Sequence, residues 1–98
     1  MVKVTTDNIF EDLGLTAEEA ALLKRKTLLI LELDTIVKRG RLNLPQAARR
    51  FGVEKAVVKE MKNKNLDFFS IELLIRMLEH AGKDVELIVR DKKPVRAA

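Results

Sequence analysis

The sequence predicts a mainly α-helical domain of four to five helices that ends in one C-terminal β-strand. Helix-capping residues stand in front of several segments in which apolar residues recur every three or four positions, and glycines follow these segments. Only residues 84–90 show the alternating, β-branched pattern of a strand. A chain of 98 residues is the size of one domain, so a second independent core is excluded.

The composition excludes several functional classes. The chain contains no cysteine, which excludes disulfide scaffolds, thiol chemistry and cysteine-based zinc sites. Its unbroken apolar runs, such as Leu28–Leu31, are far shorter than the ~18 residues that a membrane span requires. We therefore expect an intracellular, cytoplasmic protein that makes no membrane contact.

No motif in the chain predicts catalysis. His80 is the single histidine, and no cysteine or second histidine completes a metal site. Ser70 is explained as a helix cap, and Glu18 and Glu19 stand where a helix dipole favours carboxylates. There is no Walker loop and no dinucleotide fingerprint. We expect neither an enzyme activity nor a bound metal or cofactor.

The first strong helix signal begins at Thr16, after an N-terminal arm of residues 1–15. The segment Thr16-Ala17-Glu18-Glu19 has the pattern of a capping box, and the helix is predicted to run to Arg39 with Gly40 as its left-handed cap. Several leucines make this helix apolar on nearly all sides: Leu22, Leu28, Leu29 and Leu31. Either the apolar residues of the arm cover them, or they form a surface on which another chain packs. The arm residues concerned are Phe10, Leu13 and Leu15.

Two short helices joined by a tight turn are predicted next. Asn43 caps a helix that begins Leu44-Pro45-Gln46, with proline in the first turn and glutamine at the reciprocal capping position. This helix ends at Phe51, and Gly52-Val53 form the turn. Another helical pattern begins at about Glu54, with Val58 and Met61 facing inward.

The C-terminal part of the chain predicts one more helix and the strand. Ser70 caps a helix that ends at Gly82, and Phe69 and Leu74 are placed to pack together as a hydrophobic staple. In residues 84–90 the alternation of Val85, Leu87 and Val89 marks one buried face.

A single strand needs a partner, because its backbone groups and apolar face cannot stay unpaired in a stable monomer. Residues 2–5 could supply one within the chain. The same strand of a second copy is the preferred partner, because a two-fold axis makes such an edge self-complementary. We therefore expect a homodimer. After the strand, residues 91–98 are expected to form a flexible basic tail. The expected dimerisation residues are Val85, Leu87, Ile88 and Val89.

Positive charge is concentrated in the middle of the chain. Residues 38–64 hold nine cations and two anions, whereas the other 71 residues hold ten cations and thirteen anions. The nine cations are Lys38, Arg39, Arg41, Arg49, Arg50, Lys55, Lys59, Lys62 and Lys64. This asymmetry is typical of a protein with a polyanionic partner. The alternative is a solvated surface that happens to be basic.

Three pieces of sequence, in this order and spacing, carry a family resemblance across residues 8–90. They are Asn8-Ile9-Phe10-Glu11-Asp12-Leu13-Gly14, Ala47-Ala48-Arg49-Arg50-Phe51-Gly52-Val53, and the stretch from Phe69-Ser70-Ile71-Glu72 to Asp84-Val85-Glu86-Leu87-Ile88-Val89. They resemble the XRE-type helix-turn-helix proteins, and within them the small HigA-like antitoxins. The resemblance implies a lambda-repressor-like bundle with a DNA-binding domain at residues 16–83. It also implies a dimer that represses its own operon and pairs with a ribonuclease toxin.

In such a protein the second of the two short helices enters the major groove of double-stranded DNA. Lys55, Lys59 and Lys62 recur at i, i+4 and i+7, so they share the face that would do so. Ala56 and Val57 would meet thymine methyl groups there, and Arg41 would contact phosphate. One of Arg49 and Arg50 would face the DNA, and the sequence does not say which. The expected DNA-binding residues are Asn43, Gln46, Lys55, Ala56, Val57, Lys59, Lys62 and Lys64.

Two positions depart from the family pattern. Leu44 stands where the family usually has glutamine, and Glu54-Lys55 stand where serine and glutamine usually open the recognition helix. A leucine makes only apolar contacts and an acidic residue repels phosphate, so the operator sequence does not carry over. The alternative is a protein-interaction module that keeps the fold without reading DNA. RNA is a weaker candidate, because all four phenylalanines have core or staple roles.

Overall fold

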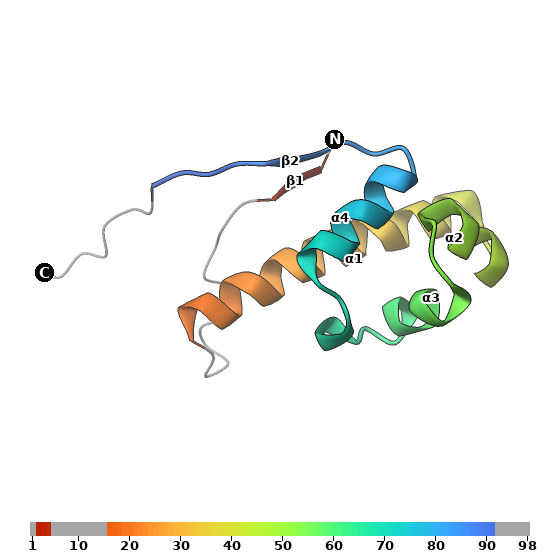
Figure 1. Cartoon of the computed structure of the whole chain (residues 1–98), viewed down its shortest axis with the longest axis horizontal. Helices are drawn as coiled ribbons and strands as arrows, with labels where there is room; N and C mark the ends of the chain where they lie inside the picture. The colour runs from red at the N-terminus through yellow and green to blue at the C-terminus, as the bar shows by residue number, and fades with distance from the viewer. Residues whose placement is uncertain (1, 5–15, 92–98) are drawn as a thin grey trace, which may run out of the picture.

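The computed structural model describes residues 2–4 and 16–91. In this part of the chain one short strand precedes and another follows four α-helices and one 3-10 helix, and the two strands lie side by side (Figure 1). The elements are β1 Val2–Val4, α1 Ala17–Gly40, α2 Leu44–Phe51, α3 Lys55–Lys62, η2 Leu66–Phe68, α4 Ile71–His80 and β2 Val85–Leu87. The predicted mainly helical class is confirmed, and a second strand is added to it.

α1 begins where its capping box predicts. The Glu19 amide donates to Thr16 Oγ1 at 3.1 Å, and Glu19 Oε1 accepts from the Thr16 amide at 3.2 Å. The prediction of Gly40 as the left-handed cap is wrong, because Gly40 is still helical and Arg41 takes that conformation with φ 49°. Gly40 instead makes room for Leu42, whose side chain would lie 3.2 Å from a Cβ at position 40.

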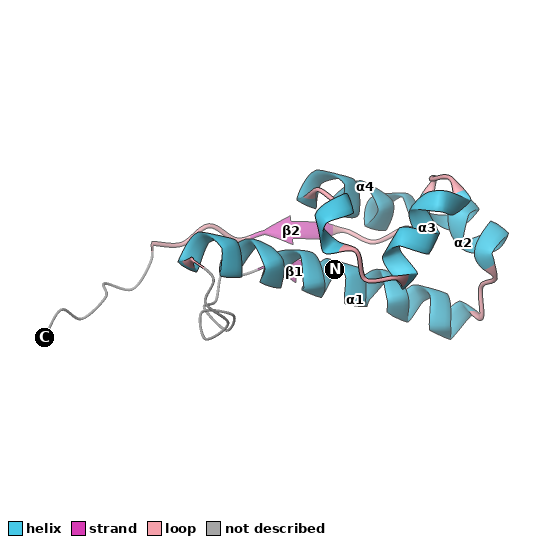
Figure 2. Ribbon diagram, turned by 90° about the horizontal axis from the view of Figure 1, so that it is seen from below, coloured by secondary structure: helices cyan, strands magenta, loops and turns pink. Residues whose placement is uncertain are grey.

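The hydrophobic core lies between α1 and α4, and α2 and α3 close it. Figure 2 shows α1 running along the whole layer formed by the other helices. Phe69 and Leu74, the expected staple, are both buried in this core. Its largest fully buried side chains are Phe51, Phe69, Leu29, Ile30, Leu33, Met61, Leu74, Met77, Leu78 and Val58. No polar or charged residue is buried in the part of the chain that the structure describes, so its charge is all at the surface.

The leucines of α1 divide between core and surface. Leu29 is buried and Leu28 half-buried, whereas Leu22 and Leu31 are 40% and 49% exposed. Leu29 therefore belongs to the core that the helices form, and the two explanations stay predictions for the other leucines. The arm residues that were expected to cover them lie outside the described residues. No helix in residues 16–91, α1 included, is long and apolar enough to cross a membrane.

β2 finds its partner within the chain. It pairs in parallel with β1, with Val2 opposite Val85, Lys3 opposite Glu86 and Val4 opposite Leu87. The preference for a second copy as the partner of this edge is therefore wrong, and residues 2–4 supply the strand. The predicted buried face is also wrong beyond its first residue, because Val85 packs against the core while Leu87 is 60% and Val89 93% exposed. Figure 1 shows the reason: the chain turns back after the C-terminal end of α4, forms β2, and then extends away from α4.

Candidate nucleic-acid interface

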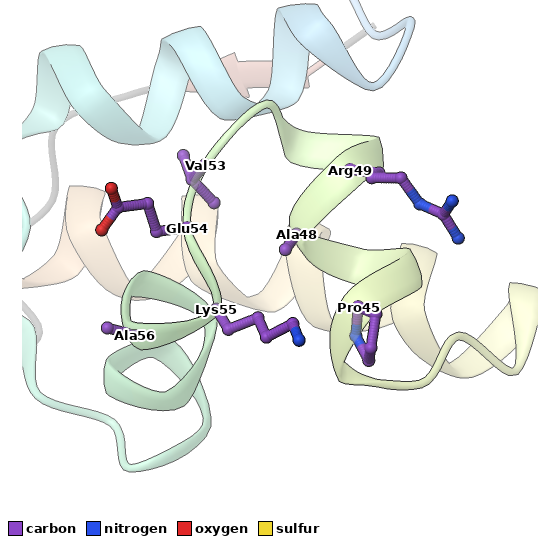
Figure 3. A pocket seen from close by; sticks show the side chains of 7 residues that line it. All are labelled: Pro45, Ala48, Arg49, Val53, Glu54, Lys55 and Ala56. Atoms are coloured by element: carbon purple, nitrogen blue, oxygen red, sulfur yellow. The ribbon is translucent and has the colours of Figure 1, made fainter.

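α2 and α3 are joined by the turn that the sequence predicts. The α2 cap uses both partners of its capping box, since Asn43 Oδ1 accepts from the Gln46 amide and Gln46 Oε1 from the Asn43 amide, each at 2.9 Å. Gly52 ends α2 with φ 67°, and the Val53 amide donates to the Ala48 carbonyl at 3.0 Å. A shallow groove lies between the two helices (Figure 3). It is lined by Pro45, Ala48, Arg49, Val53, Glu54, Lys55 and Ala56.

The C-terminal end of α4 holds the C-terminal end of α2. His80 Nδ1 donates to the Arg50 carbonyl at 3.1 Å, and Arg50 Nε donates to the Ala81 carbonyl at 3.3 Å. A Cβ on Gly52 would lie 2.7 Å from the His80 ring. Arg50 is thus engaged by α4, which leaves Arg49 as the arginine at the groove. No local sequence signal could reveal this contact, because its partners are about 30 residues apart.

The recognition-helix face is largely as predicted. Lys55, Ala56, Lys59 and Lys62 are exposed on α3, while Val58 and Met61 are buried on its other side. Val57 is a correction: it is half-buried and packs against the core, so it is not part of the open face. The exposed face therefore presents three ammonium groups and one methyl group.

The N-terminal end of α2 lies beside this face and offers hydrogen-bond donors. Asn43 and Gln46 are exposed, but their side-chain oxygens are both used in the capping box. Only their amide NH2 groups remain available, and these suit phosphate oxygens. Leu44, which stands where the family usually has glutamine, packs against the core and offers no hydrogen-bonding group to a base or phosphate.

The two anions of residues 38–64 lie on the same helix pair. Glu60 accepts a hydrogen bond from the Asn65 side chain beyond the end of α3. Glu54 is the cap residue of α3, and its carboxylate makes no capping hydrogen bond. In Figure 3 the carboxylate of Glu54 and the ammonium group of Lys55 extend in opposite directions, so this anion does not neutralise the lysine next to it.

A side chain of α1 holds the connection that follows α3. Lys26 Nζ donates to the Leu66 carbonyl at 3.2 Å, which fixes η2 to the long helix. Lys64, one of the expected contacts, is exposed in this connection with φ 59°. Neither η2 nor the role of Lys26 was predicted, because a three-residue 3-10 helix has no apolar periodicity to detect.

Two short helices joined by a glycine turn, with a basic face on the second, define the helix-turn-helix class. A family model described as a helix-turn-helix domain matches residues 9–90. A solved structure described as a transcriptional regulator of the XRE family is 34% identical, with a TM-score of 0.71 over 82% of this chain and 90% of that one. None of the curated proteins matches. The chain belongs to the helix-turn-helix family, in its XRE group, a class that places its second helix in the major groove of DNA.

Proposed function

We propose that the protein is a sequence-specific DNA-binding transcriptional repressor. The observation that carries the proposal is the exposed face of α3, where Lys55, Lys59 and Lys62 lie together. Lysine contacts guanine acceptors or phosphate oxygens, and the methyl group of Ala56 can meet a thymine methyl. The concentration of cations in residues 38–64 supplies the long-range attraction that brings a duplex to this face.

Salt dependence tests this proposal. Neutralising several phosphates releases counterions, so log K is expected to fall linearly with log salt, with a slope near −0.9 for each contact. The measurement is a fluorescence titration of the whole chain with a duplex from upstream of its own gene, repeated over salt concentrations. A scrambled duplex of equal length gives the specificity ratio. A salt response that is flat would remove the DNA proposal.

We also propose that the repressor acts as a homodimer. β2 has β1 on one edge and leaves its other edge for a second copy, and Leu87 at the end of β2 and Val89 just beyond it are exposed. Two recognition helices about 34 Å apart would then read successive major grooves of a palindromic site. Val85 and Ile88 are half-buried and would support the strand from within.

Val89→Lys tests the dimer. In a dimer that pairs through this segment, both lysines would lie in the interface, where like charges cost several kcal/mol, so the dimer dissociation constant is expected to rise by about 10²-fold or more. Val89→Thr keeps the β-branched shape without the charge and serves as the control. Sedimentation velocity measures both. Because Val89 is 93% exposed, the fold itself should be unchanged. A dimer that survives Val89→Lys would show that the copies meet elsewhere.

We further propose that the repressor is the antitoxin of a two-gene module. The resemblance to HigA-like antitoxins supports this, and Leu22 and Leu31 on α1 offer exposed apolar side chains for a second protein. Co-expression with the neighbouring gene and affinity purification tests it, with Leu22→Lys as the variant that should release the bound product. If no complex forms with the unaltered chain, the antitoxin role is rejected and the repressor role is unaffected.

A further inference from the structure

The described residues contain four positions with positive φ, and two of them are unusual. Gly52 and Gly82 occupy two, as expected, since glycine adopts the left-handed conformation without steric cost. Arg41, with φ 49°, and Lys64, with φ 59°, occupy the others. A residue with a side chain is uncommon there, and asparagine, aspartate and histidine are the usual exceptions. Both exceptions in this chain are cations.

Both residues follow the end of a helix, where glycine is the favoured choice. Arg41 ends α1, and its amide donates to the Lys38 carbonyl at 3.2 Å. Lys64 follows α3, and its amide donates to the Met61 carbonyl at 3.1 Å. The Asn65 amide then reaches the Glu60 carbonyl at 3.1 Å, which completes the hydrogen-bond pattern of a Schellman motif. The backbone needs no side chain at either position.

Glycine takes the left-handed position after the other two α-helices that the structure describes. Gly52 ends α2 inside the helix-turn-helix, and Gly82 follows α4. Among the described helix ends, cations therefore replace glycine only at the two connections that flank the α2–α3 pair. Figure 1 shows these connections on either side of the pair. Both side chains are exposed, and in the described part of the chain neither has a hydrogen-bond or ion-pair partner.

The geometry of a duplex explains this placement. The ~12 Å wide major groove admits an α-helix that lies in it, and α3, with eight residues, is about 12 Å long. With α3 in the groove, the two connections lie on either side of the inserted helix pair, where the phosphates that border the groove run. We infer that Arg41 and Lys64 are positioning residues that hold the two phosphate walls, kept as cations in a conformation that favours glycine. The inference rests on the proposed DNA binding.

A structural alternative exists, because cations near a helix C-terminus are favoured by the helix dipole. Arg41→Gly and Lys64→Gly separate the two explanations. If the residues contact phosphate, each substitution lowers the steepness of the salt dependence by about 0.9, or about 1.8 in a dimer that carries it twice. The melting temperature should change little, because the relieved backbone offsets the lost dipole interaction. If they serve the dipole only, the salt slope stays as it was, and the melting temperature again changes little for the same reason.

The experiment uses the whole chain and a mixed-sequence duplex of 30 base pairs, since phosphate contacts do not depend on sequence. Lys83→Gly is the matched control, because Lys83 is an exposed cation beside the left-handed Gly82 at the end of α4. It should leave the slope unchanged, and so should the charge-conserving Arg41→Lys and Lys64→Arg. If either glycine variant fails to fold, asparagine replaces glycine, since it also tolerates this conformation.

The outcomes distinguish this inference from the proposed function. An unaltered chain that binds no duplex rejects both. An unaltered chain with a steep salt slope that Arg41→Gly and Lys64→Gly leave unchanged rejects the inference alone. A lower slope in both variants, with Lys83→Gly like the unaltered chain, supports it.

Discussion

Replacing Lys59 and Lys62 together by alanine is expected to weaken duplex binding by about 10³-fold. Both side chains are exposed on the open face of α3. If each lysine contributes about 1 kcal/mol and a dimer carries four, the loss is about 4 kcal/mol, and each 1.4 kcal/mol is tenfold in affinity. The measurement is the titration described above, at one fixed salt concentration. Stability should change by less than about 1 kcal/mol, since exposed substitutions rarely do more and alanine is a good helix former.

Lys83→Ala with Arg76→Ala is the matched control for this pair. It removes the same charge from the α4 side of the molecule, where both residues are exposed and Arg76 forms only a surface ion pair with Glu72. Its effect on affinity should be limited to long-range attraction, and less than about tenfold. If the control weakens binding as much as the α3 pair does, net charge and not the α3 face carries the affinity. If the α3 pair lowers the melting temperature strongly, its face is misassigned.

The helix boundaries could be predicted because their signals are local. Thr16, Asn43 and Ser70 each accept a hydrogen bond from an amide three residues ahead, so the pattern and the structure involve the same few residues. The end of α1 could not be placed in this way. Gly40 is needed because the Leu42 side chain packs closely against it, and Arg41 takes the left-handed conformation instead.

The partner of β2 could not be predicted, because the pairing is non-local. Val2 and Val85 are at opposite ends of the chain, and β1 has only three residues. A short terminal strand carries almost no sequence signal of its own. The prediction of a second copy followed from the rule that an edge needs a partner, and the rule itself holds. It does not say which of two candidate strands will supply that partner.

The candidate site was predictable in its charges and less so in its packing. The spacing of Lys55, Lys59 and Lys62 fixes a common face on any α-helix, so their exposure followed from the sequence. Val57 shows the limit of this reasoning. The width of the buried side of α3 depends on what the neighbouring helices place against it, and here it extends to Val57.

Gly52→Ala, which adds one methyl group at the turn between α2 and α3, is expected to destabilise the protein by about 2–3 kcal/mol. The left-handed backbone at φ 67° costs a residue with a Cβ about 1–2 kcal/mol. The new Cβ would also lie 2.7 Å from the His80 ring, so the ring must move and give up its hydrogen bond to the Arg50 carbonyl, worth about 1 kcal/mol. Thermal unfolding should show a melting temperature lowered by roughly 10–20 °C.

A double-mutant cycle with His80→Ala separates these two causes. Once the ring is removed, Gly52→Ala should cost only the backbone contribution of about 1–2 kcal/mol, which gives a coupling of about 1 kcal/mol between the two positions. Denaturant unfolding of the four proteins measures this coupling. An equal cost with and without the ring would mean that the turn does not depend on α4. The expected coupling would instead identify His80 as the residue that sets how closely the turn of the helix-turn-helix can approach α4, and therefore how α3 is presented to a duplex.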